Sequence, residues 1–220
     1  MKKTISIKDA ISLIKDGDTV MVGGFLVNGC PEKLVDALAE SGRKELTLIT
    51  NDTGFVDRGV GKLVVNKQVK KIIATHVGLN KEAGRQMLAG ETEVVLVPQG
   101  TLAEQIRAAG YGLGGVLTPT GIGTLVEEGK DKITVDGKEY LLEKPLHADV
   151  ALLYAAKVDQ AGNMAYKGSE NNFNNVMASA ARVTIVEGGE VVEVGELHPN
   201  SVGTPGIFVN FIVDGGDSGG

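Results

Sequence analysis

Segments with the hydrophobic period of a helix alternate with segments of strand period along the whole chain. The first helix is predicted over Ile7 to Ile14, with Ser6 as its N-cap. A buried strand is predicted over Thr19 to Phe25, and a second helix from Pro31 to Gly42. Such alternation is typical of a mainly parallel sheet covered by helices. The sequence therefore predicts an open α/β sheet and excludes all-helical and mainly β folds.

The same alternation continues to the end of the chain. Further strands are predicted at 46–50, 71–75, 93–97, 150–156, 183–187 and 207–213, and further helices at 81–89, 101–109 and 173–181. Lys132 to Glu143 alternates in period two around Asp136-Gly137, a strong hairpin signal, so we expect a small β-hairpin insertion. Because no linker or repeat divides the sequence, we predict a single domain over residues 1–214 and a flexible tail over 215–220.

Composition excludes several classes of function. A net charge of −6 and only nine aromatic residues (four Tyr, five Phe) do not fit nucleic-acid binding, which needs a basic surface and stacking rings. Apolar stretches such as 150–156 are far shorter than the roughly 18 residues of a membrane span. The single cysteine, Cys30, fits a reducing compartment, so we expect a cytoplasmic protein that does not bind membranes. The three histidines are widely separated, so no metal site is expected.

The loop from Gly23 to Pro31 leaves the carboxyl end of the first strand and enters a helix. Ligands bind at this position in open α/β sheets. The adjacent glycines Gly23 and Gly24 would let backbone N–H groups approach a ligand, and the start of the following helix favours phosphate or a developing oxyanion. A plain tight turn is the alternative interpretation of this loop.

A longer pattern surrounds this loop. Asp16 to Pro31 reads DGDTVMVGGFLVNGCP: DG, two residues, three apolar residues, GGF, three residues, G, one residue and P. Further motifs follow in order: NDT (51–53), VPQGTLAEQIRAAG (97–110), GLGGVLTPTGIGTLVEEGK (112–130), NNFNNVMASAARVTIVE (171–187) and TPGIFVNFIV (204–213). On these motifs, and over essentially its whole length, the chain resembles the alpha subunit of the family I CoA-transferases.

The resemblance implies an enzyme of acyl-CoA and fatty acid metabolism. Such an enzyme moves CoA between an acyl-CoA and a free carboxylate, here a short-chain substrate such as acetate, butyrate or acetoacetate. It implies the open sheet shared with ribose-phosphate isomerase-like enzymes, no permanently bound cofactor and coenzyme A as a substrate. It also implies a beta subunit as partner, in an assembly of two alpha with two beta chains. Burial of Phe25 and the loops around it at the subunit boundary would be the physical reason for that assembly.

The family reacts by ping-pong through a glutamate of the beta half, which forms an acyl-glutamyl anhydride and then a glutamyl-CoA thioester. In the family this glutamate belongs to an SENG motif. The triplet Ser169-Glu170-Asn171 has three of these letters, but Asn172 follows instead of glycine and the triplet lies late in the chain. We therefore interpret Glu170 as a solvated or helix N-terminal acid. A chain without the nucleophile is expected to be inactive alone.

The resemblance singles out Gln99 of VPQGT as the catalytic residue of this chain. Its family counterpart offers an amide N–H₂ to the thioester carbonyl oxygen, and a neutral donor just past a strand end can serve an oxyanion in this way. A loop-capping glutamine is the structural alternative. The residues expected to bind the acyl group or CoA are Gly23, Gly24, Phe25, Leu26, Asn28, Gly29, Asn51 and Gly100. An Asn-Asp turn is an equally good interpretation of Asn51.

Two rival functions remain open at this stage. The first is a free-standing hydrolase or sugar-phosphate isomerase of the same fold, with Glu170 or another acid as its base. The second is a non-catalytic module that senses sugar phosphates, as in regulators with a similar sheet. This second hypothesis predicts a DNA-binding segment, and the sequence shows none.

Overall fold

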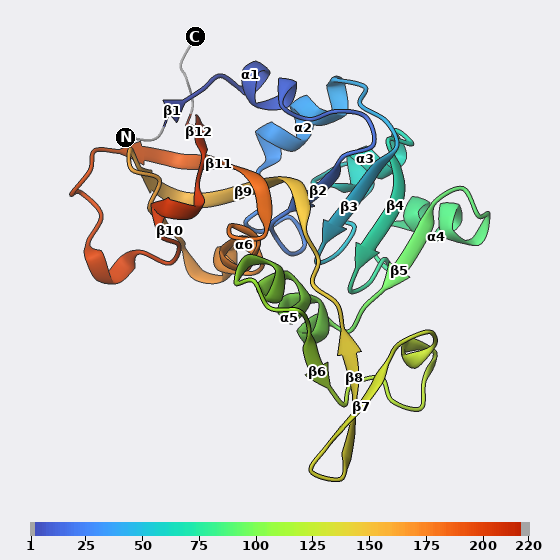
Figure 1. The fold of residues 1–220 in the computed structure, drawn as a ribbon. Helices are drawn as coiled ribbons and strands as arrows, with labels where there is room; N and C mark the ends of the chain where they lie inside the picture. Colours follow the sequence, from blue (N-terminus) through green and yellow to red (C-terminus); the bar gives the residue numbers. More distant parts are fainter. Residues whose placement is uncertain (1–2, 217–220) are drawn as a thin grey trace.

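A mainly parallel sheet forms the centre of the computed structural model, which describes residues 3–216 (Figure 1). Its strands are β1 (Lys3–Thr4), β2 (Thr19–Val22), β3 (Leu46–Thr50), β4 (Val69–Ala74), β5 (Glu93–Leu96), β9 (Ala148–Asp159), β10 (Met164–Ala165), β11 (Ala181–Val192) and β12 (Phe211–Asp214). Within the described residues their order is β1-β12-β11-β9-β2-β3-β4-β5, and all neighbours on this path are parallel. In the described part of this sheet, only β10, beside β9, is antiparallel to its neighbour. The open, mainly parallel sheet predicted from the sequence is confirmed.

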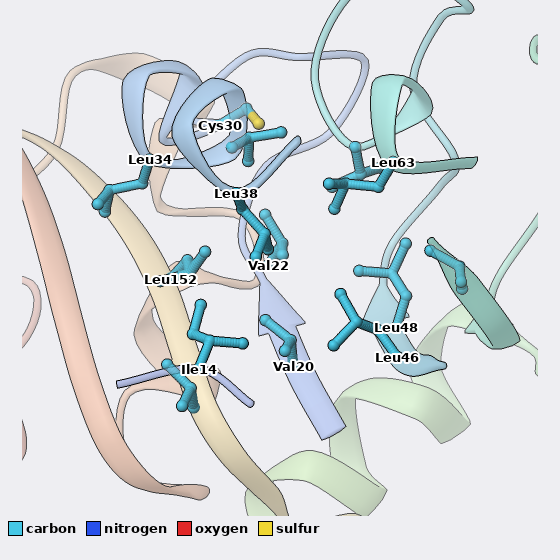
Figure 2. Packing of buried hydrophobic residues seen from close by; sticks show 14 of the residues in the cluster. Ile14, Val20, Val22, Cys30, Leu34, Leu38, Leu46, Leu48, Leu63 and Leu152 are labelled. Atoms are coloured by element: carbon cyan, nitrogen blue, oxygen red, sulfur yellow. The ribbon is translucent and has the colours of Figure 1, made fainter. Parts of the chain in front are cut away.

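Helices cover both faces of this sheet. They are α1 (Ile7–Ser12), α2 (Glu32–Glu40), α3 (Gly61–Val65), α4 (Lys81–Leu88), α5 (Gln99–Gly110) and α6 (Asn174–Met177). Val20 and Val22 of β2 pack in one hydrophobic cluster with residues of α1 to α4 (Figure 2), whereas Met21 packs in a second cluster with α5 and α6. Because both faces of β2 are buried, its sequence is a continuous apolar run rather than an alternating one.

The predicted β-hairpin insertion is confirmed, and it belongs to a separate small sheet. Strands β7 (Lys132–Val135) and β8 (Lys138–Glu143) meet at Asp136 and Gly137, which both have positive φ. The strand β6 (Val116–Thr118), which the periodicity did not predict, pairs antiparallel with β8. This sheet projects from the body below α5 (Figure 1). The buried Glu143 anchors it there, since its carboxylate accepts hydrogen bonds from Lys130 at 2.6 Å and Gln105 at 3.0 Å.

Several further segments differ from the expectation. The helix predicted over 173–181 is only the four residues of α6, because β11 begins at Ala181 to pair with β9. The strand predicted over 207–213 begins only at Phe211, since Gly206–Phe208 forms a 3-10 turn in which Ile207 is 82% exposed. Helix α3 was not predicted, because five residues are too short for a clear helical period. Other 3-10 turns are Leu125–Glu127, Gly168–Asn171 and Pro199–Ser201.

The strand order places a switch point at β2. From β2 the sheet grows through β3, β4 and β5 on one side and through β9, β11 and β12 on the other. Loops that leave neighbouring strands at such a point diverge and leave a crevice at the carboxyl ends, which is where ligands bind in open α/β sheets. The tail expected over 215–220 lies, from residue 217 onward, outside the described residues.

Candidate active site

The loop after β2 is a tight turn at this carboxyl edge. The Phe25 N–H donates to the Asn28 carbonyl at 3.0 Å, and the Asn28 N–H donates back to the Phe25 carbonyl at 2.9 Å. The two central residues, Leu26 and Val27, have φ values of +48° and +64°. Two-residue turns of this kind favour asparagine and glycine, and a left-handed conformation costs other residues about 1–2 kcal/mol each. The turn is therefore strained and must be held by its surroundings.

Contacts from two sides hold the turn. On the β3 side, the buried carboxylate of Asp52 accepts the Leu26 N–H at 2.9 Å and the Gly54 N–H at 2.6 Å. On the β9 side, the amide of Asn174 donates to the Gly29 carbonyl at 2.8 Å. Sequence reasoning missed both Asp52 and Asn174. Only their place just after a strand or at the start of a short helix could have indicated them.

The two adjacent glycines of the loop do different things. The Gly23 N–H donates to the Leu152 carbonyl at 3.1 Å, so it extends the sheet and is not free for a ligand. A side chain at Gly23 would place its Cβ 1.9 Å from the Asn174 Oδ1, so this glycine is required for packing. Gly24 has a φ of +107°, which favours glycine, and a Cβ there would lie 2.9 Å from the Cys30 nitrogen. Packing against the Asn174 side chain therefore explains Gly23, and close approach of the loop backbone to itself explains Gly24.

A network of amide side chains joins three further loops beside the turn. Gln99, the first residue of α5, donates from Nε2 to the Asn51 Oδ1 at 3.2 Å. Asn51 is fully buried; its Oδ1 also accepts the Thr75 hydroxyl at 2.9 Å, and its Nδ2 donates to the Asn172 Oδ1 at 3.0 Å. Gln99 itself is exposed. The structure thus brings the predicted residues Gln99 and Asn51 together, with Asn51 fixing the direction of the Gln99 amide.

Other predicted site residues lie in the loop after β2, at the same edge of the sheet. The Phe25 ring lies 5.9 Å from the ring of His76, which follows β4, so the two rings form a wall at the same edge. Asn28 is exposed and donates to the Ser169 hydroxyl at 2.7 Å, whereas Gly29 is buried against Glu170. Leu26 is half-buried.

A cavity of about 330 Å³ lies beside Gln99, between the first turn of α5 and β6. Gly100 contributes to its lining; the other lining residues are Pro98, Thr101, Glu104, Val116, Leu117, Thr118 and Thr120. No heavy atom lies within 4 Å of where a Gly100 Cβ would stand, so this glycine leaves room at the helix start. The size fits the range of small-molecule sites.

Glu170 has a local structural partner. Its Oε2 accepts the Lys167 N–H at 2.7 Å, which caps the 3-10 turn Gly168–Asn171. This geometry agrees with the interpretation of Glu170 as an acid at a helix start. The structure also brings Glu170 next to the turn, since its carbonyl accepts the Asn174 amide at 2.7 Å.

Cys30 is a buried member of the hydrophobic cluster that includes residues of α2. Burial raises the pKa of its thiol well above the usual value, and the neighbouring carboxylates of Glu32 and Glu187 raise it further. Because the thiolate is the nucleophilic form, this environment suppresses the reactivity of Cys30.

We expect iodoacetamide to alkylate Cys30 at pH 8 at least roughly tenfold more slowly in the native protein than in denaturant. The folded state retains a proton that the unfolded chain releases, so the free energy of unfolding should fall as pH rises above about 8.5. The Cys30→Ala variant should lack this part of the pH dependence. Mass spectrometry of the alkylated chain and urea titrations at several pH values measure the two effects. Equal native and denatured rates would contradict the expectation.

Neither a metal cluster nor a membrane span is found in the described part of the chain. Over residues 3–216, no group of three or more His, Cys, Asp and Glu side chains is arranged to hold a metal ion. In the same residues, no helix has the length and apolarity to cross a bilayer.

The fold and the site define a class: an α/β protein with a polar site at the carboxyl edge of a parallel sheet, at its switch point. A family model described as Coenzyme A transferase matches residues 4–215. The chain therefore belongs to the coenzyme A transferase family, as the sequence motifs indicated.

Named relatives narrow this to the alpha type of chain. The chain is 56% identical to the acetate CoA-transferase subunit alpha of Escherichia coli (strain K12) over 96% of both chains. It is 52% identical to the acetoacetyl-CoA:acetate/butyrate CoA transferase alpha subunit of Clostridium acetobutylicum, over 96% of this chain and 97% of the relative. These matches identify the chain as an alpha-type subunit of a CoA-transferase.

Solved structures agree on the fold. The thioester complex of an acyl-CoA transferase from E. coli O157:H7 superposes with a TM-score of 0.84 at 25% identity. The match covers 97% of this chain and 47% of that chain, so this chain spans about half of the longer protein. Glutaconate coenzyme A-transferase from Acidaminococcus fermentans gives a TM-score of 0.84 at 21% identity, over 96% of this chain and 75% of that chain.

Proposed function

We propose that this chain is the subunit of a short-chain CoA-transferase that supplies the oxyanion donor and shapes the acyl site, whereas its partner supplies the nucleophile. In this proposal CoA is moved between a short-chain acyl-CoA or 3-oxoacyl-CoA and a free acetate, butyrate or acetoacetate. The observation that supports it best is the hydrogen bond between Gln99 and Asn51 beside the turn after β2. This bond uses one N–H of the Gln99 amide and fixes the orientation of the group, so that the second N–H would be the donor to the acyl group that the resemblance leads us to expect at this edge.

The proposed reaction is ping-pong. A glutamate carboxylate of the beta subunit attacks the thioester carbonyl and displaces the CoA thiolate, which forms an acyl-glutamyl anhydride. The thiolate then attacks the glutamyl carbonyl, releasing the first carboxylate and leaving a glutamyl-CoA thioester. The second acid reverses these steps. Gln99 would donate an N–H to the oxygen that becomes negative during each attack, and Asn51 would keep that donor in place.

Coenzyme A enters this proposal only as a substrate, and no resident cofactor is invoked. The partner is a beta subunit, expected in an assembly of two alpha and two beta chains. The relatives named above are themselves alpha subunits, which supports the existence of such a partner. The cytoplasmic location expected from the sequence stays a prediction.

The proposal predicts activity only from the assembled enzyme. We expect acetyl-CoA to form from acetoacetyl-CoA or butyryl-CoA plus acetate when this chain is mixed with a candidate beta subunit, and not from this chain alone. A glutamyl thioester on the beta chain, destroyed by borohydride, should accumulate with acyl-CoA. Glu170→Ala, which removes only the cap on Lys167, should leave the turnover of the mixture close to that of the wild type.

The rival hypothesis, a free-standing hydrolase or isomerase, predicts instead that this chain is active without a beta subunit. Turnover by this chain alone, abolished in Glu170→Ala, would move the nucleophile or base into this chain. The position of Glu170 next to the turn makes this comparison necessary. Activity in the mixture that survives Glu170→Ala would exclude this rival.

A further inference from the structure

The turn after β2 has an unusual conformation for its sequence. Both of its central residues, Leu26 and Val27, lie in the left-handed region that L side chains rarely adopt. The reciprocal bonds between Phe25 and Asn28 close the turn, but they do not fix its tilt against the sheet. A contact from outside the turn is needed to determine where its backbone points.

Asp52 supplies such a contact from a distant part of the sequence. Its Oδ2 accepts the Leu26 N–H from 26 residues away, and its Oδ1 accepts the Gly54 N–H. The residue is only 5% exposed, so both bonds are shielded from water. With both oxygens engaged by backbone donors, the carboxylate is fixed relative to the end of β3 and fixes the turn in the same way.

Asn51, the residue before Asp52, binds the catalytic side chain proposed for this site. Asn51 binds the Gln99 amide, while Asp52 binds the turn, so two consecutive residues determine the separation of the amide donor and the turn. An aspartate suits this position better than an asparagine. It faces two N–H donors, and an asparagine side chain would present an NH₂ group to one of them.

We propose that Asp52 is a positioning residue that holds the turn 25–28 in its left-handed conformation opposite Gln99. This inference rests on the proposed CoA-transferase function and adds to it the group that sets the geometry of the acyl site. Asp52 touches no reacting atom in this proposal and acts through the backbone of Leu26.

The test is a mutant cycle in the assembled enzyme. Asp52→Asn should lower kcat roughly 100-fold, the effect of a small misplacement of a catalytic site. In a Leu26→Gly background the same substitution should lower kcat less than about tenfold, because glycine adopts positive φ without strain and needs less support. Loss of general stability alone would reduce activity equally in both backgrounds.

Asp149→Asn is the matched control. Asp149 accepts the backbone N–H of Thr19 at 3.0 Å at the opposite end of β2, so it makes the same kind of bond away from the site. Its side chain is 42% exposed and accepts this one backbone N–H, so Asp149→Asn should lower the melting temperature less than Asp52→Asn does, with kcat close to wild type. An unchanged kcat in Asp52→Asn, or equal losses in the two backgrounds, would overturn the proposal.

A second measurement separates this inference from the function on which it rests. If wild-type mixtures were inactive, this result would contradict the proposed function but not the positioning role of Asp52. Amide hydrogen exchange of the full chain still tests the positioning, since the Leu26 amide should exchange at least roughly tenfold faster in Asp52→Asn than in the wild type. Unchanged exchange at Leu26 would refute the role of Asp52 whatever the activity.

Discussion

Replacement of Gln99 by alanine should lower the turnover of the assembled enzyme roughly 10- to 1,000-fold, the range observed when one oxyanion donor is lost. The structure supports this expectation in a specific way. The Gln99 amide is exposed at the carboxyl edge, yet its direction is fixed by the bond to Asn51, so the donor is preorganised. The measurement is kcat with acetoacetyl-CoA and acetate, using saturating concentrations of both.

A second glutamine provides the control for this substitution. Gln160 follows β9 and donates to the Glu193 carboxylate at 2.6 Å, outside the amide network around Asn51, so Gln160→Ala should leave kcat unchanged. If Gln99→Ala also left kcat unchanged, Gln99 would be a loop-capping residue and the oxyanion donor would have to be sought among the backbone N–H groups of the turn.

Replacement of Gly23 by alanine should lower the free energy of unfolding by about 2–4 kcal/mol. The new Cβ would stand 1.9 Å from the Asn174 Oδ1, so the asparagine side chain must move. Asn174 accepts the Tyr154 N–H and donates to the carbonyls of Gly29 and Glu170, and all three bonds would be lost. Such a change is a large part of the 5–15 kcal/mol stability of an ordinary domain. Urea titration measures it.

A second glycine gives the control for Gly23→Ala. Gly84 lies inside α4, and no heavy atom stands within 4 Å of the place that a Cβ would take there. Gly84→Ala should therefore raise the free energy of unfolding by about 0.5–1 kcal/mol. If the clash with Asn174 is the cause of the loss, Asn174→Ala should remove much of the additional cost of Gly23→Ala. Fully additive losses would contradict that cause.

Much of the fold could be predicted because local signals and the final topology agree. Ser6 caps α1 as expected, accepting the Asp9 N–H at 3.0 Å, and β3 occupies the residues predicted for it. The hairpin around Asp136-Gly137 was likewise visible in the sequence, because both turn residues tolerate positive φ. The errors at α6 and β12 arose where an apolar run was read without knowledge of its partners. Ile207, for example, is apolar but points into solvent.

The residues of the candidate site were likewise predicted only in part. The motifs led to Gln99, Asn51 and the loop from Gly23 onward, because the carboxyl ends of parallel strands meet at one edge. They did not lead to Asp52 or Asn174, whose roles depend on backbone groups that are distant in sequence. Gly23 was predicted to let its backbone N–H approach a ligand, whereas this N–H binds the Leu152 carbonyl and the missing side chain makes room for Asn174.

The sequence by itself determined the alternation of elements, the family and the residues at the strand ends, because these follow from hydrophobic period and short motifs. The tertiary structure alone decided which of those residues hold one another. Asp52 and Leu26 are 26 positions apart, and Asn174 and Gly29 are 145 apart. Their hydrogen bonds exist only because the sheet order places β2 between β3 and β9. Pairing across that distance depends on topology, which no local period encodes.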